Sequence, residues 1–580
     1  MPSAPSTQVR PDFITKVSGA TITPEIAQDI ISIEVDLSVD VPDMATLIIS
    51  DSALGDLPHL NTIVGWIGQP IEISTAKFSG QRVSGSQPKL PLFKGEVVGI
   101  EPRFEETGEA SIIVRAYDKR HRLNRETRTA AYLQKSASDI IKQIASEKGL
   151  TIDINSTSII YQQLIQRNQT DLDFINYLAR LNGFEVRFED PKLIVKPPAD
   201  TTSVPLEWGV ELRSFYPRLS LSGQVNEVSV KAWDLKNNAA LVGTATTSKS
   251  QPSIGYGKWG GQAAQAAFSA AKHFEVEIPM ENQSEATNVA ESILNRINTD
   301  FIEADGSTFG NPDIKPGKAV EISRVGPKFS GKYIITSATH VYTPDADYVT
   351  YFRIEGSQRK LMADLLDASA SSSEQVSGLA VAVVTNLDDP DGIGRVKVKY
   401  PLLKNMPGNT ELESFWAPVV SIGGGKDTGI FWLPEVNDTV LLGFENGNIN
   451  RPFVLGGVWN SKAATPIAKG DLLEQSSKVK TRVLQTRTGH KIVFTDSDSS
   501  SKLEIMDKGA VTKITFDTQN KALGIESQGK GALKTAQAME IKSDATINIQ
   551  STGSLTIKGS SISVEASGTL TLKGATVNIN

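Results

Sequence analysis

The residues of this chain that could carry out chemistry are few and lie far apart. None of the five histidines has the His-Glu-x-x-His or paired spacing of a metal site: His59, His121, His273, His340 and His490. There is no cysteine, which excludes disulfides, thiol nucleophiles and cysteine-based zinc sites. No Gly-x-Ser-x-Gly nucleophile motif occurs. We therefore expect no catalytic residues, no metal site and no cofactor, and hence a protein that is not an enzyme.

Two short polar stretches resemble ligand loops without the residues that would bind a ligand. GGGKDTG (423–429) has Asp427 where a phosphate loop needs Ser or Thr, and Val420 where it needs glycine. DDPDG (388–392) lacks the spacing and the closing glutamate of a calcium loop. We interpret these two stretches as turns of a β domain, and FEETGE (104–109) as an exposed hairpin tip.

The composition is that of an ordinary soluble protein, with 580 residues, 39% hydrophobic, 22% charged and a net charge of −7. No basic block is present, so we expect no nucleic-acid partner. The N-terminus lacks the apolar core of a signal peptide, and no apolar run is long enough to span a bilayer. We expect assembly in the cytoplasm without a signal peptide, and contact with a target membrane only by mechanical force.

Strands dominate the expected secondary structure. Alternating apolar and polar residues predict strands across 15–115, with Ile31, Ile33, Val35 and Leu37 on one face. A compact β block is expected at 379–460. The small-residue-rich segment 244–272 is predicted to be a surface loop.

Three helices interrupt these strands. The first is expected from Ser136 to a stop at Gly149, and the second from a capping box at Thr170 and Asp173. Phe174, Tyr177, Leu178 and Leu181 form the apolar stripe of the second helix, which Gly183 ends. The third begins near Ser284 and carries Val289, Ile293 and Ile297. We expect all three stripes to pack against sheet.

The C-terminal segment repeats a short apolar pattern. Pairs of apolar residues separated by one residue recur at steps of 8, 8, 7, 8 and 7 residues, with Gly, Ser, Thr, Asn and Asp between them. The members of the pairs are Met539, Ile541, Ile547, Ile549, Leu555, Ile557, Ile562, Val564, Leu570, Leu572, Val577 and Ile579. Each unit fits one short strand followed by a turn.

This period is too short for one coil of a single-chain solenoid, which needs about 20 residues. Seven or eight residues make one side of a triangle, so three chains would close each coil and bury the pairs on a common axis. We therefore expect an intertwined triple-stranded β-helix and a homotrimer. A single-chain solenoid or a flexible tail is the alternative.

Several motifs resemble those of a known family. The order of Asp389-Pro390, Gly394-Arg395-Val396, Trp416-Ala417, LPEVNDTVLLGFENGN and RPFVLGGVWN resembles the OB-fold domain of VgrG spike proteins and of phage tail needles. Upstream, AYDKRHRLNR and QRNQTDLDFINYLARLNGFEVRF resemble the hub region of VgrG and phage tail proteins. VDVPDMATLIISD is most similar to the spikes of extracellular, phage-tail-like contractile injection systems.

The resemblance implies a mainly β protein with an α+β hub, barrel-like hub domains, an OB-fold and the trimeric β-helix. We expect a first hub β-barrel domain at 1–130, an α+β hub insertion at 131–200, a second hub β-barrel domain at 201–365, a linker at 366–378, the OB-fold domain at 379–460, a connector at 461–485 and the β-helix spike at 486–580. The connector is too short for the lysozyme domain that some relatives carry there.

The family further implies a function and partners. A trimeric hub would cap a hexameric inner tube, contact baseplate proteins and pierce a target envelope when a sheath contracts. A PAAR-type tip protein is expected on Val577, Asn578, Ile579 and Asn580, and cargo effectors are expected to be separate chains. The alternatives are a phage tail baseplate needle, a trimeric receptor-binding tail protein and a spike with hydrolase activity.

Overall fold

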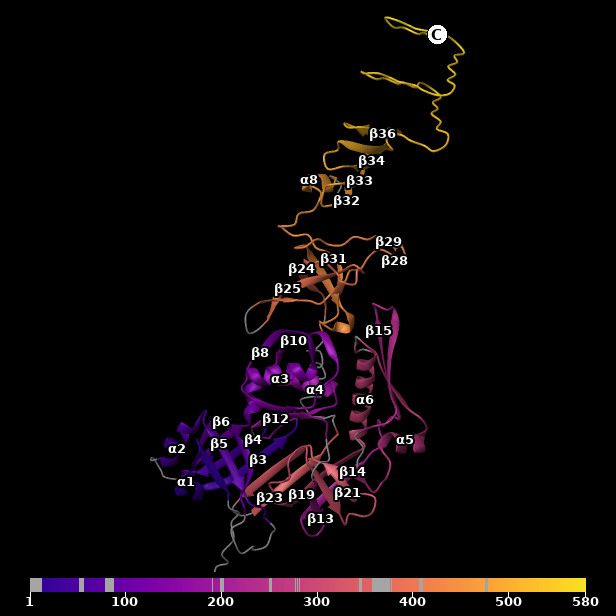
Figure 1. Cartoon of the computed structure of the whole chain (residues 1–580). Helices are drawn as coiled ribbons and strands as arrows, with labels where there is room; N and C mark the ends of the chain where they lie inside the picture. Colours follow the sequence, from indigo (N-terminus) through magenta and orange to yellow (C-terminus); the bar gives the residue numbers. More distant parts are fainter. Residues whose placement is uncertain are drawn as a thin grey trace, which may run out of the picture. The chain divides into compact units, whose positions relative to one another are not determined.

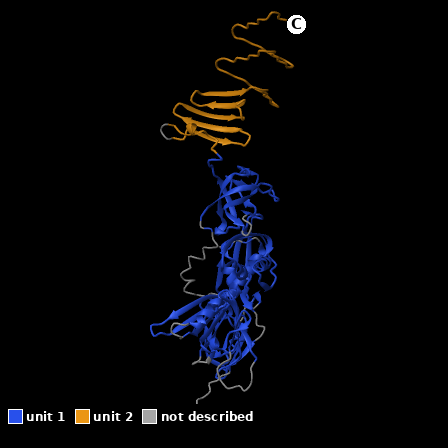
Figure 2. Cartoon of the chain, turned by 90° about the vertical axis from the view of Figure 1, so that its left-hand side faces the viewer, with its two compact units in different colours: residues 1–463 blue, residues 464–580 orange. Residues whose placement is uncertain are grey.

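The computed structural model describes residues 13–51, 57–78, 88–189, 191–198, 203–249, 253–276, 278, 280, 282–343, 347–356, 376, 378–405, 410–474 and 478–579 (Figure 1). The chain divides into two compact units, Met1–Ala463 and Ala464–Asn580 (Figure 2). Strands form most of the regular structure in both, which confirms the mainly β class. None of the helices in the described ranges combines the length and the apolar character that crossing a bilayer requires.

An eleven-stranded sheet forms the base of the first unit. Its order is β14-β19-β23-β22-β3-β4-β7-β6-β5-β1-β2. The strands are β1 (Ile14–Val17), β2 (Ala20–Thr21), β3 (Ile30–Ser38), β4 (Met44–Ser50), β5 (Pro70–Thr75), β6 (Leu90–Phe104), β7 (Ala110–Tyr117), β14 (Leu212–Leu219), β19 (Ile302–Phe309), β22 (Ser337–Thr343) and β23 (Asp347–Ile354). The short helices α1 (Pro24–Gln28), α2 (Pro58–Ile63), η1 (Val64–Trp66) and η2 (Lys119–Asn124) lie in its N-terminal part.

The pairing of β3 with β22 joins the two predicted hub segments into this one sheet. The antiparallel register runs from Ser38 opposite Ser337 to Ile33 opposite Tyr342. Ile33, Val35 and Leu37 are buried as the alternation predicts, but the prediction for Ile31 is wrong, because its side chain is exposed. A register shift between Ile30 and Ser32 in the β3–β4 ladder displaces Ile31 from the buried row.

The α+β insertion packs two helices on short sheets. α3 (Ala137–Glu147) begins at the Ser136 cap, and α4 (Asp171–Leu181) begins at Thr170, whose hydroxyl accepts from the Asp173 amide; both predicted helix starts are confirmed. Gly149 and Gly183 follow the helix ends with positive φ, as predicted. The strands are β8 (Thr127–Ser136), β9 (Thr151–Ile154), β10 (Ile160–Thr170), β11 (Glu185–Glu189) and β12 (Lys192–Lys196).

The second hub segment adds two further sheets with the orders β13-β20-β21-β17 and β16-β15-β18. The third predicted helix is present as α6 (Gln283–Thr299), capped by Asn282, and it lies beside β15 and β16. The strands are β13 (Ser203–Glu207), β15 (Glu227–Asp234), β16 (Ala239–Ala245), β17 (Ser253–Ile254), β18 (Lys272–Glu275), β20 (Ala319–Ser323) and β21 (Gly331–Ile334).

The predicted loop at 244–272 is wrong for its second half. Helix α5 (Gly260–Phe268) follows Trp259, which is 3% exposed and belongs to the core that α6 and β15 share. Ala263 and Ala264 are also buried. Small residues here serve close packing and helix formation rather than an exposed loop, because alanine is the best helix former and leaves room for neighbouring side chains.

The β block after residue 378 is a six-stranded sheet with its own core. Its path is β26-β25-β24-β30-β31, with β27 paired to β25. The strands are β24 (Ala380–Asn386), β25 (Arg395–Asn405), β26 (Thr410–Glu413), β27 (Ala417–Pro418), β30 (Thr439–Phe444) and β31 (Pro452–Gly457), and η4 (Glu445–Gly447) precedes β31. Most of the predicted linker at 366–378 lies outside the described residues.

Amide side chains fasten this block to the two-stranded β8–β10 sheet of the insertion. Gln163, 3% exposed, donates to the Glu413 carbonyl at 2.7 Å and accepts from the Phe415 amide at 2.5 Å. Asn450 accepts from the Ile165 amide at 2.8 Å, and Ile165 packs into the core of the block. Hydrogen bonds and a buried apolar side chain thus connect the insertion to the block at the same place.

The second unit is an antiparallel meander of five strands: β32 (Thr481–Gln485), β33 (Lys491–Ser497), β34 (Ser500–Met506), β35 (Thr512–Asp517) and β36 (Ala522–Ser527). The short helix α8 (Lys469–Leu472) precedes it. The meander begins at Thr481, inside the predicted connector, because β32 pairs with β33 along its whole length. Residues 528–579 are described without a strand.

We predict that Gln163→Ala loosens the joint between the insertion and the six-stranded block. The loss leaves the Glu413 carbonyl and Phe415 amide without their partner, which costs about 1–3 kcal/mol per buried group. Hydrogen exchange of peptides covering 411–416 should accelerate relative to the wild type. Gln162→Ala, an exposed neighbour on β10, is the control; equal exchange in both variants would contradict the prediction.

Candidate functional site

The structure keeps the five histidines apart. His59 contacts Asp29 at 2.7 Å, and His121 contacts Glu96 at 2.8 Å, a carboxylate that also accepts from Arg122. His273 lies in β18, and His490 lies before β33. His340 is buried, with Nδ1 2.8 Å from the Tyr348 hydroxyl and Nε2 3.0 Å from the Ile314 carbonyl. Within the described ranges, no three His, Asp or Glu side chains gather into a set that could hold a metal ion.

The two stretches that resemble ligand loops are turns, as predicted. Residues 424–429 pair as the hairpin of β28 (Gly424–Gly425) and β29 (Thr428–Gly429). Asp389 caps the turn before β25, accepting from the amides of Asp391, Ile393 and Arg395. Its carboxylate also accepts from the Arg395 guanidinium at 2.6 Å. The carboxylate is therefore already saturated by the protein itself.

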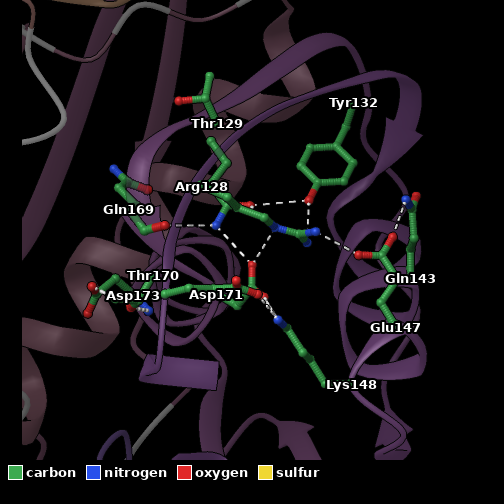
Figure 3. A network of polar contacts seen from close by, with 12 residues as sticks. Arg128, Thr129, Tyr132, Gln143, Glu147, Lys148, Gln169, Thr170, Asp171 and Asp173 are labelled. Atoms are coloured by element: carbon green, nitrogen blue, oxygen red, sulfur yellow. Dashed lines mark hydrogen bonds and ion pairs between the residues drawn. The ribbon is translucent and has the colours of Figure 1, made fainter. Parts of the chain in front are cut away.

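A cluster of charged residues that the sequence did not predict lies between α3 and α4 (Figure 3). The Arg128 guanidinium is 2.7 Å from both Glu147 and Asp171, and donates to the Tyr132 hydroxyl at 3.1 Å. Burial raises the pKa of Tyr132, so its hydroxyl stays protonated and donates to Gln166 at 3.2 Å. Buried charges paired in this way hold elements together, and this cluster links both helices to the antiparallel strands β8 and β10.

A second buried cation holds the hub sheet against the insertion. Arg120 is 0% exposed and donates to Asp118 at 2.8 Å and to Asp43 at 2.9 Å. It also donates to the carbonyls of Ser38 and Val186, both at 3.2 Å. One side chain therefore links the end of β3, the loop before β4, η2 and β11. Neither cluster leaves a group positioned for catalysis.

One face of the five-stranded meander is apolar and uncovered within its own unit. The registers align Leu484, Ile492, Ile505, Ile514 and Ile525 in one row across the strands. A second row on the same face contains Phe494, Leu503, Phe516 and Leu523, with Arg482 at its edge. The phenylalanines and Ile525 are exposed, and we call these nine apolar residues the shaft face.

The shaft face was not predicted from the sequence. Its signal is a simple alternation in each strand, repeated every 9–11 residues, rather than the pair repeat that begins at Met539. The opposite face carries polar residues such as Glu504 and Thr515. An apolar face of this size on an isolated sheet marks a contact surface, because water would otherwise cover it.

The twelve predicted pair residues lie outside any strand of the described chain. Their side chains are 49% to 84% exposed, and the structure of this single chain does not bring them together. Of the predicted tip residues, Val577 and Ile579 are exposed, and Asn580 lies outside the described residues. Burial of the pairs on a trimer axis therefore remains a prediction.

Comparison with known families matches most of the chain. The model of the Alg8 N-terminal domain matches residues 10–343, more than half of the chain. The chain belongs to this family. A second model, the Type VI secretion system/phage-baseplate injector OB domain, matches residues 380–459. It covers the six-stranded block, so the predicted OB-fold is confirmed.

Curated relatives of this Alg8 N-terminal domain chain include VgrG proteins. The Type VI secretion system spike protein VgrG3 of Vibrio cholerae is 30% identical over 125 residues, 21% of this chain and 12% of that protein. VgrG1a of Pseudomonas aeruginosa is 30% identical over 122 residues, 19% of each chain. The actin cross-linking toxin VgrG1 of V. cholerae is 24% identical over 198 residues, 33% of this chain and 17% of that protein. The chain thus spans under a fifth of each relative's length.

A solved structure shares the fold. A chain of the Francisella PdpA-VgrG complex in its half-lidded form superposes with a TM-score of 0.54 at 10% identity, covering 89% of this chain and 88% of that one. For the lidded form the TM-score is 0.52, and the superposition covers 89% of this chain and 80% of that one. These superpositions show a shared fold, and the matches to the VgrG3 and VgrG1a spike proteins confirm the resemblance that the motifs predicted.

We predict that His340 makes the hub sensitive to acid. Burial lowers the pKa of His340 from 6.5 to about 3. Between these values the unfolded state binds one proton more than the folded state, so stability falls as the pH drops from 6.5 toward 3, by about 1.4 kcal/mol per pH unit. Denaturation midpoints should therefore fall less between about pH 7.5 and about pH 5 in His340→Gln than in the wild type.

The control for this prediction is His273→Gln, at a half-buried position of β18. This variant should keep the pH dependence of the wild type. His340→Gln is expected to be less stable at neutral pH, because it loses hydrogen bonds, so the slope with pH is the quantity compared. Equal slopes for the wild type and His340→Gln would contradict the prediction.

Proposed function

We propose that this protein is the structural hub and spike of a contractile injection particle. The matches to spike proteins and to the baseplate injector OB domain support this function. In this role the hub caps a hexameric inner tube and contacts baseplate proteins. Sheath contraction drives the spike into a target envelope, so the membrane is contacted only mechanically. The protein acts within an assembled particle and does not act as an enzyme.

The observation that carries the proposal is the amount of apolar side chain that one chain leaves uncovered in its second unit. The shaft face and the twelve pair residues together form an apolar series from Leu484 to Ile579. At about 25 cal/mol per Å² of apolar area removed from water, covering such a series contributes a large stabilisation to any assembly that buries it.

Two further copies of the same chain are the partners that fit these apolar surfaces. Three copies place three identical apolar faces around one axis, and the intervals of seven or eight residues fit the sides of a three-chain prism. Each copy also supplies strand edges for its neighbours to pair with. A homotrimer therefore accounts for the shaft face and the pair residues with one arrangement.

We predict that Ile557→Asp prevents a stable trimer from forming. The substitution would place three carboxylates near the threefold axis, where burial disfavours each charge. Light scattering after gel filtration should give a trimer for the wild type and a smaller species for the variant. Thr556→Asp, at the adjacent outward position, is the control and should remain trimeric. A wild-type monomer, or trimers of equal heat stability in both variants, would contradict the proposal.

Within this function we propose that a PAAR-type tip protein binds Val577, Asn578, Ile579 and Asn580. The exposed apolar side chains of Val577 and Ile579 would be covered by that protein. Deleting residues 577–580 should abolish its co-purification with the trimer and leave the mass of the trimer unchanged. Retention of the tip protein by the shortened trimer would contradict this assignment. Cargo effectors, as separate chains, are a further class of partner.

A further inference from the structure

A cavity of about 340 Å³ lies in the hub where three regions of the chain meet. Its wall is formed by the end of β3, the first half of β6, β11 and the segment before β20. Apolar residues such as Leu37, Leu92 and Phe188 line part of it. This volume lies at the lower end of the range of small-ligand pockets. The cavity borders the Arg120 cluster through Ser38 and Asp43, whereas the joint to the OB block and the Arg128 cluster contribute no residue to its lining.

Cations predominate among the charged residues of this cavity. Four basic side chains line it, Lys94, Arg187, Lys315 and Lys318, against the two carboxylates of Asp43 and Glu189. Asp43 already accepts from Arg120 at 2.9 Å. Lys94 pairs with Glu72 at 3.2 Å, so the surplus of positive charge comes from Arg187, Lys315 and Lys318. Such a surplus in a partly enclosed space favours an anion.

A tight turn presents two of these cations. In Lys315-Pro316-Gly317-Lys318 the Lys318 amide donates to the Lys315 carbonyl at 3.2 Å, and Gly317 has a φ of 75°. Proline followed by a glycine with positive φ is the pattern of a type II turn, which brings its first and fourth residues close together. Lys315 Nζ donates to the Pro91 carbonyl at 2.7 Å, and burial, followed by the charge of Lys318, lowers the pKa of Lys315.

The guanidinium of Arg187 is held against the same turn. A Cβ atom on Gly317 would lie 2.7 Å from Arg187 Cδ, so a larger residue at this position would displace the Arg187 side chain. Arg187 Nε is 3.5 Å from Glu189, whereas its Nη1 is buried without a hydrogen-bond partner among the described residues. Lys318 likewise forms no ion pair with a described residue. A buried donor that lacks a protein acceptor indicates an acceptor from a ligand.

We propose that this cavity binds an oxyanion of a small solute, either a phosphate or a carboxylate group, held by Arg187 and the Lys315–Lys318 turn. The planar fork of Arg187 suits the two oxygens of such a group, and the lysines supply point charges. Because the lining residues come from β6, β11 and the turn before β20, a bound anion would tie the insertion to both halves of the hub. This site is independent of the spike function proposed above.

The test is calorimetric titration of the full-length protein with inorganic phosphate and, separately, with citrate, each against chloride at matched ionic strength. Saturable binding of one anion per chain is expected for at least one probe, and the stronger probe identifies the chemical source. Lys318→Met should weaken binding about tenfold, the effect of losing one charge-assisted hydrogen bond. Arg187→Met should weaken it at least as much.

Lys462→Met, at an exposed lysine far along the chain, is the matched control and should bind as the wild type does. Thermal midpoints in chloride alone establish that each variant is folded; if Arg187→Met fails this check, Lys318→Met decides the outcome by itself. No saturable binding of either probe would overturn the proposal. Unchanged affinity in folded Lys318→Met would overturn it as well.

Discussion

Apolar surface that one chain cannot cover is the constraint on which the second unit depends. An antiparallel meander of five strands has two faces, and here one is polar while the other carries the nine residues of the shaft face. A single layer of sheet cannot bury its own apolar face, since burial needs a second layer. The pair residues from Met539 onward are likewise apolar and exposed, in a segment that the structure describes without strands. This uncovered apolar surface is the physical basis of the assembly proposed above.

In the first unit the main constraint is different: regions far apart in the sequence must be held in fixed positions. Its ladder between β3 and β22 joins residues about 300 positions apart, so that one sheet runs through both hub segments. The buried cation Arg120 then fixes the insertion against that sheet. Arg128 fixes the two helices of the insertion against strands β8 and β10. Breaking one partner of such a cluster leaves a buried charge uncompensated, which makes the arrangement rigid rather than adjustable.

Local features of the fold could be predicted from the sequence, and features that depend on distant partners could not. The caps at Ser136 and Thr170 act within one helical turn, so the residues that define them are adjacent in the sequence. The predicted burial of Ile31 was wrong because the bulge beside it depends on pairing with β4. The predicted loop at α5 was wrong because Trp259 is buried by contacts with α6 and β15, which are distant in the sequence. The OB-fold was recognisable because several of its motifs occur in a fixed order.

The same distinction applies to the functional surfaces. The repeat after Met539 can be read from the sequence because each side chain's position follows from its interval. The cavity beside the Lys315–Lys318 turn could not be predicted, because its basic residues come from segments more than 90 and 120 positions apart, and only the folded hub brings them together. Regularity along the chain thus marks the surface that we propose meets other copies, whereas the polar sites inside the hub arise from long-range pairing. A substitution in the β3–β22 ladder would accordingly disturb the hub without altering the pattern that encodes the shaft.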